Sequence, residues 1–130
     1  MSIRFVAVGL VCCAFSTAHA QGKLPAELGG SGVSGMGRTA PWSIVIESQE
    51  ADGTLKGKMN WSGRSCNFTN LPFSGTYREG TLELSAPQTN EKCGAWTIKM
   101  KRTSASEVEF EGTATTSDSP VAASVYLKSR

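Results

Sequence analysis

Residues 52–66 read DGTLKGKMNWSGRSC, and this stretch determines the fold class. From Leu55 to Trp61, small or apolar residues alternate strictly with lysine and asparagine. A period of two places alternate side chains on opposite faces of a β-strand. The Asp52-Gly53 pair in front of it is a strong signal for a hairpin turn. The stretch therefore predicts a strand with one buried face that follows a tight turn.

The same alternation occurs in six further segments, and no segment has a helical period. The chain is therefore expected to be all-β, a small antiparallel up-and-down β-barrel or a closely related β-sandwich of seven strands with one disulfide. The residues predicted to face inward are, strand by strand, Trp42, Ile44 and Ile46; Leu55, Gly57, Met59 and Trp61; Leu71, Phe73, Gly75 and Tyr77; Leu82 and Leu84; Trp96, Ile98 and Met100; Val108, Phe110, Gly112 and Ala114; and Val121, Ala123, Val125 and Leu127.

The three inward glycines have two interpretations, bends in a coiled sheet or hollow space for a ligand. The hairpin registers follow from the turns. They set Ile44 opposite Trp61 in the first hairpin and Ile98 opposite Phe110 in a later one. In these registers lysines lie across from glutamates on the outer face, and each such pair contributes roughly 0.2–1 kcal/mol.

Residues 1–20 have the features of a cleaved signal peptide. A short apolar run at residues 5–14 precedes an Ala-His-Ala motif at residues 18–20. The run is too short for a membrane helix, which needs about 20 residues. Cys12 and Cys13 lack the small preceding residue of a lipoprotein site. We expect a soluble exported protein without a stable membrane anchor, periplasmic or secreted.

The remaining chain divides into a flexible Gly-rich segment, residues 21–41, and a β-barrel domain, residues 42–130. Without Arg4 it carries 12 basic residues against 11 acidic ones, a net charge of +1. This balance argues against nucleic acid as a partner.

Loss of the leader removes the only histidine, His19, and leaves two cysteines, Cys66 and Cys93. An even pair in an exported chain predicts one disulfide. A Ser-His-Asp triad, a Cys-His pair and an ordinary zinc site are excluded without histidine. A carboxylate pair for glycoside hydrolysis would need an inward acid, and only Glu91 lies in the long loops. We expect no catalysis, no metal and no cofactor.

Counting hairpins places three tryptophans, Trp42, Trp61 and Trp96, at the same end of the sheet, beside both cysteines and Phe68. The indoles form either a hydrophobic plug or a ligand-binding mouth. For the mouth, the candidate ligand-binding residues are Trp42, Trp61, Arg64, Phe68, Asn70 and Trp96, with Asn67, Gln88 and Asn90 as a further polar fringe. The expected function is a non-catalytic binding module for a small apolar or sugar-like ligand. The alternative is a protein-interaction module, such as an inhibitor of an extracellular enzyme or an envelope assembly component.

Five segments, DGTLKGKM, FSGTY, CGAWTIKM, FEGTATT and VAASVYLKS, follow one another between residues 52 and 129. Their order resembles the strand sequence of the avidin and streptavidin family, and the resemblance implies a closed β-meander. Phe110 replaces the tryptophan of the family's sixth-strand motif, and the terminal strand with the biotin-contacting aspartate is absent. The resemblance therefore does not imply biotin binding.

Overall fold

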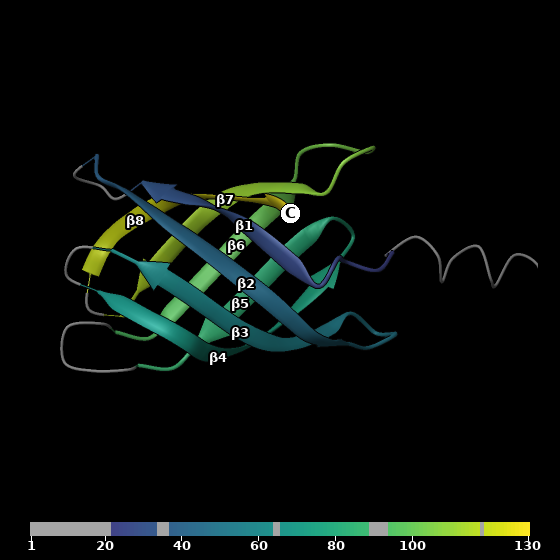
Figure 1. Cartoon of the computed structure of the whole chain (residues 1–130), viewed down its shortest axis with the longest axis horizontal. Coiled ribbons are helices and arrows are strands. Elements are labelled where there is room, and N and C mark those ends of the chain that lie inside the picture. Colours follow the sequence, from purple (N-terminus) through teal and green to yellow (C-terminus); the bar gives the residue numbers. More distant parts are fainter. Residues whose placement is uncertain (1–21, 34–36, 64–65, 89–93, 118) are drawn as a thin grey trace, which may run out of the picture.

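The computed structural model describes residues 22–33, 37–63, 66–88, 94–117 and 119–130. Within these residues, eight antiparallel strands close into one barrel (Figure 1). Each strand pairs with the next and β1 pairs with β8, so the sheet has no free edge. This confirms the predicted all-β barrel and excludes the sandwich. The strands are β1 (Glu27–Val33), β2 (Thr39–Gln49), β3 (Thr54–Ser62), β4 (Asn67–Arg78), β5 (Thr81–Ala86), β6 (Trp96–Arg102), β7 (Glu109–Thr116) and β8 (Ser119–Ser129).

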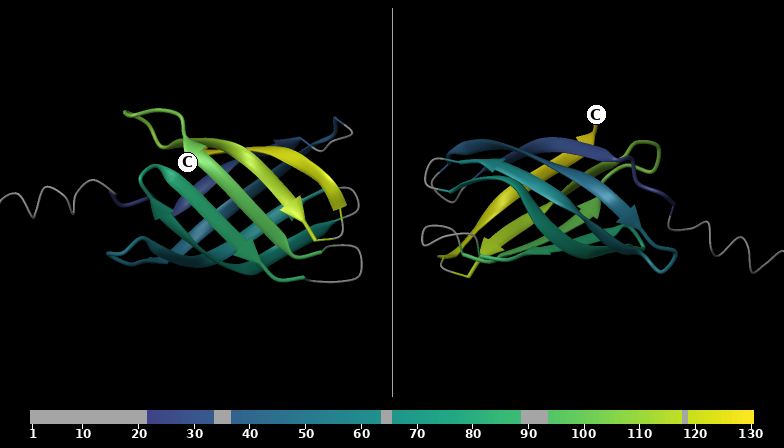
Figure 2. Two further views of the ribbon diagram at one scale, coloured as in Figure 1. Left: turned by 180° about the vertical axis from the view of Figure 1, so that it is seen from behind. Right: turned by 60° about the horizontal axis from the view of Figure 1, so that its bottom comes forward.

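The meander gives the barrel two different ends, visible in both views of Figure 2. We call the end where β2, β4, β6 and β8 begin the loop end, and the opposite end the turn end. At the turn end, Glu79 and Gly80 connect β4 to β5 with φ angles of 51° and 77°. Two successive positive φ values define the type I′ turn that matches the twist of a hairpin. The predicted tight turn at this position is confirmed.

The predicted count of seven strands is wrong because the Gly-rich segment contains β1. In this strand Leu28 is buried inward, and the next inward positions are Gly30 and Gly32. A Cβ on Gly32 would overlap Cη2 of the Trp61 indole and lie 2.8 Å from its Cζ3. The inward face of β1 is thus covered by side chains from neighbouring strands. A strand that supplies so few apolar side chains of its own has no detectable period of two.

Residues 22–26, also expected to belong to a flexible segment, are attached to the barrel near the turn end. The Leu24 side chain is buried, and its backbone N–H donates to Gln49 Oε1 at 2.8 Å. Gln49 Nε2 donates in turn to the carbonyl of Gly22 at 2.9 Å. The N–H of Ile46 donates to the Ala26 carbonyl at 2.8 Å. The ordered domain therefore begins well before residue 42.

Side chains fill the barrel interior, and the predicted inward alternation holds along β3, β5 and β6. Among the three inward glycines, Gly57, Gly75 and Gly112, a Cβ on any one would overlap a backbone carbonyl oxygen of the neighbouring strand. These positions are glycine because strands approach closely where the sheet coils. The other interpretation, that they leave hollow space for a ligand, is wrong.

The register predicted for the first hairpin is wrong by two residues. Trp42, not Ile44, lies opposite Trp61, and Ile44 lies opposite Met59. One residue of the shift comes from the turn, which centres on Asp52 because Glu50 pairs with Thr54, and the other comes from a β-bulge between Ile46 and Ser48. Because the shift is even, every inward side chain stays inward.

The β6–β7 register is wrong by four residues. Ile98 pairs with Ala114 instead of Phe110, since residues 103–108 form a loop longer than the predicted turn. Arg102 stabilises this loop, because its Nε donates hydrogen bonds to the carbonyls of Ser104 at 2.9 Å and Glu107 at 3.2 Å. Opposite charges still meet on the outer face, in the pairs Lys101–Glu111 and Glu109–Lys128.

Candidate functional site

The three tryptophans meet at the loop end, as the sequence predicted. Trp42 and Trp61 are direct cross-strand partners, with ring centroids 6.0 Å apart. Trp61 lies 5.0 Å from Trp96, and the Phe68 ring meets Trp96 edge-on at 5.8 Å. The exposed fractions of the three indoles are only 3%, 9% and 6%. The indoles therefore close this end of the barrel, as in the plug interpretation.

The Trp42 ring packs against Trp61, and its indole nitrogen is hydrogen-bonded as well. Its Nε1–H donates to two backbone carbonyls, Ser31 O at 3.2 Å and Tyr126 O at 3.1 Å. These carbonyls lie on paired residues of β1 and β8, where the barrel closes. A buried indole N–H is costly unless it finds an acceptor, so this arrangement stabilises both the ring position and the closure.

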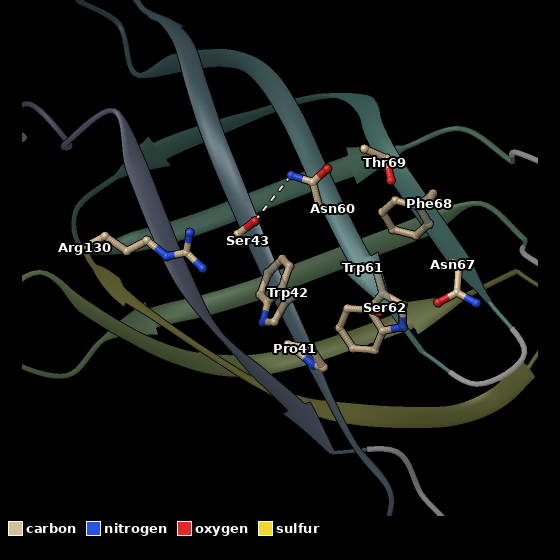
Figure 3. A pocket seen from close by; sticks show the side chains of 10 residues that line it. All are labelled: Pro41, Trp42, Ser43, Asn60, Trp61, Ser62, Asn67, Phe68, Thr69 and Arg130. Carbon is tan, nitrogen blue, oxygen red and sulfur yellow. Dashed lines mark hydrogen bonds between the residues drawn. The ribbon is translucent and has the colours of Figure 1, made fainter.

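A hollow of about 260 Å³ lies beside this plug, on the outer face of the barrel, where β2, β3 and β4 approach the loop end (Figure 3). We call it the loop-end hollow. Its wall combines amide and hydroxyl side chains of the outer face with parts of three aromatic residues. The lining residues are Pro41, Trp42, Ser43, Asn60, Trp61, Ser62, Asn67, Phe68, Thr69 and Arg130.

A chain of hydrogen bonds crosses three strands at this hollow. Asn60 Nδ2 donates to Ser43 Oγ at 3.4 Å, the dashed contact of Figure 3. Asn60 Oδ1 accepts the backbone N–H of Asn70 at 2.9 Å. Asn70 has a φ of 55°, at the irregularity where β4 shifts register against β3 between Met59 and Trp61. The amide of Asn60 thus holds the bulged start of β4 in place beside the hollow.

The charges of the wall limit what the loop-end hollow can bind. Among the ten lining side chains, that of Arg130 is the only charged one, and none is a carboxylate. Ser62, Asn67 and Thr69 are exposed and present hydroxyl and amide groups that both donate and accept. The wall is suited to a neutral or acidic molecule with several hydroxyl groups.

The structure brings together only part of the predicted site. Trp42, Trp61 and Phe68 line the loop-end hollow, and Trp96 lies behind them. Asn70 is exposed and reaches the hollow only through Asn60. Phe68 belongs to β4, which begins at Asn67, and not to the loop where it was expected.

The remaining predictions for this end fall partly outside the described residues. Arg64, Asn90 and Cys93 lie there. Cys66 packs against the core, and its pairing with Cys93 stays a prediction. Gln88 is exposed and does not line the hollow.

Five polar lining residues were missed: Ser43, Asn60, Ser62, Thr69 and Arg130. The alternation did place Asn60 on the outer face of β3. Its cross-strand partner is Ser43, however, and the wrong register of the first hairpin separated the two. The sequence signal that could have identified these lining residues is a set of outward polar residues next to a cross-strand Trp–Trp pair.

A second hollow, of about 440 Å³, lies on the outer face of β1, β7 and β8. It contains Val33, the exposed large apolar side chain of the described residues, together with Glu111 and Tyr126. Desolvation, and after it the charge of Glu109, raises the pKa of Tyr126 above its usual 10.0. At the turn end, the backbone N–H of Thr54 lowers the pKa of Asp52.

Within the described ranges, no three His, Cys, Asp or Glu side chains gather as metal ligands. The same part of the chain contains no helix that is long and apolar enough to cross a membrane.

Comparisons with protein-family models, curated proteins and solved structures find no match to this chain. The resemblance to the avidin family therefore stays a hypothesis.

Proposed function

We propose that this protein is an exported, non-catalytic binding module that takes a small sugar-like ligand in the loop-end hollow. The observation that carries the proposal is the lining of that hollow. Residues with amide and hydroxyl groups from β2, β3 and β4 line it together with Trp42, Trp61 and Phe68. Sugars have the same mixture, with hydroxyl groups around an apolar ring face. Specificity in binding sites usually comes from a few placed polar groups of this kind.

The size of the hollow favours one small unit over a long chain. Its volume of about 260 Å³ is just below the usual range for ligand pockets, about 300–1,000 Å³. Of the two ligand classes expected from the sequence, the apolar one needs an open aromatic face. The three indoles are at most 9% exposed, so the hydroxylated ligand is the better fit.

The rigidity of the site supports the same proposal. The Asn60 amide fixes the start of β4, and the indole plug fixes the strands behind it. The predicted bridge between Cys66 and Cys93 would fasten the loop end further. Little conformational entropy would then be lost on binding, which favours affinity in a small site.

The experiment is a calorimetric or tryptophan-fluorescence titration with neutral hexoses such as glucose and galactose. We expect saturable binding by the parent protein and weaker binding by Asn67→Ala, because Asn67 lines the hollow. Ser74→Ala is the matched control, an exposed polar residue of the same strand outside the hollow. Binding that is absent, or equal in all three proteins, would contradict the proposal.

The alternative, a protein-interaction module, is favoured by the second hollow. A partner protein would dock over Val33 and Tyr126 on β1 and β8. In that case the hexose titrations show no binding, and Val33→Ser abolishes capture of the extracytoplasmic partner.

A further inference from the structure

Trp96 differs from the other aromatic residues of the plug because its polar atom is left unpaired. Its Nε1 is fully buried and has no hydrogen-bond acceptor among the residues that the structure describes. The side chain as a whole is 6% exposed. The nearby Trp42, by contrast, shares its N–H between two carbonyls. An unsatisfied buried donor is uncommon in native proteins and calls for a partner, such as a water, an ion or a ligand.

The indole that carries this donor packs against the wall of the loop-end hollow. Two of its lining residues, Trp61 and Phe68, pack directly on Trp96, at centroid distances of 5.0 and 5.8 Å. Trp61 is held between two other indoles. Phe68 is only partly buried and touches Trp96 edge-on. Phe68 is therefore the side chain that can move aside to join the hollow to the indole nitrogen.

The backbone around Phe68 is irregular although Asn60 holds it in place, so the movement is that of the Phe68 side chain alone. The β3–β4 ladder shifts register between Met59 and Trp61, next to Phe68. Asn70, two residues along β4, has a φ of 55°. Left-handed backbone at a non-glycine residue is strained, and such strain concentrates where ligands bind. The start of β4 is thus the least regular part of the wall.

Building on the function proposed above, we propose that the ligand is an N-acetylated amino sugar whose acetamido carbonyl accepts the hydrogen bond of Trp96 Nε1. The acetamido group has the two properties that a ligand group beside Trp96 Nε1 needs. Its carbonyl oxygen is a strong acceptor, and its methyl group is small and apolar enough to lie among Trp61 and Phe68. The sugar hydroxyls remain at the polar rim, against Asn67 and Thr69.

The test uses two sugars that differ in this group, N-acetylglucosamine and glucose. In a ¹⁵N–¹H spectrum of the full chain, the Trp96 indole N–H, assigned from its correlations with the Trp96 side chain and backbone, should move downfield on addition of N-acetylglucosamine. Glucose should leave it in place. We expect N-acetylglucosamine to bind about tenfold more tightly than glucose, the usual effect of one buried hydrogen bond. Trp96→Phe should bind both sugars alike, at about the affinity of the parent for glucose.

Two results would overturn the inference while leaving the proposed function intact: equal affinity for the two sugars, or a Trp96 resonance that N-acetylglucosamine does not shift. A Trp96 N–H resonance already in a hydrogen-bonded position in the free protein, and unmoved by either sugar, would show that the donor has another partner and would overturn the inference as well. Failure of both sugars to bind would remove the proposed function itself. The spectrum of the parent protein decides the question even if Trp96→Phe does not fold.

Discussion

Replacing Gly32 by alanine tests how β1 closes the barrel. The new Cβ would overlap the outer atoms of the Trp61 indole, and this ring is confined by Trp42 at 6.0 Å and Trp96 at 5.0 Å. Overpacking of this kind costs about 1–3 kcal/mol, and the stiffer unfolded chain returns about 0.4–1 kcal/mol. We therefore expect the free energy of unfolding in urea to fall by about 1–2 kcal/mol.

A double-mutant cycle identifies the source of this loss. The shorter ring in Trp61→Phe lacks the indole atoms Cη2 and Cζ3 that crowd Gly32. Gly32→Ala should then cost at least ~1 kcal/mol less in the Trp61→Phe background than in the parent. Ser31→Ala, on the outward face of the same strand, is the control and should change stability by no more than about 0.5 kcal/mol. An equal cost of Gly32→Ala in both backgrounds would refute the packing argument for β1.

Three further predictions concern the stability of the barrel and the titration of one of its tyrosines. Reducing the predicted Cys66–Cys93 bridge, which closes a loop of about 28 residues, should lower the free energy of unfolding by ~3–4 kcal/mol, and a free-thiol assay should find no thiol before reduction. Gly112→Ala should cost about 3 kcal/mol or more in urea, because its Cβ would overlap the backbone carbonyl of Lys99, which cannot move alone. Tyr126 should titrate above pH 10 when its ionisation is followed by ultraviolet absorbance. Because folding raises the pKa of Tyr126, the contribution of this side chain to stability is present below pH 10 and is lost as the pH rises through the raised pKa.

Much of the barrel follows from the period of two in the sequence. The alternation along residues 54–62 and 96–102 sets the inward faces, and the Glu79-Gly80 pair sets a turn. The gathering of the indoles follows from strand order alone. These features depend on local patterns, which a single sequence displays.

Features that depend on contacts between distant strands could not be predicted in the same way. β1 is a strand because Trp61 and Val125 cover Gly32, and both residues are far away in the sequence. The bulge after Ile46 supplies one of the two residues by which the first hairpin shifts, and no turn signal indicates it. The loop-end hollow depends on that register, since Ser43 meets Asn60 only in the shifted pairing.

The proposed function depends most on the loop-end hollow being the binding site. The direct measurement is a map of ¹⁵N–¹H chemical-shift changes across the barrel during titration with N-acetylglucosamine. We expect the largest changes at Asn60, Asn67 and Thr69 and at the Trp96 indole, with β7 and β8 unaffected. Changes that instead centre on Val33 and Tyr126, or no changes at saturating sugar, would contradict it.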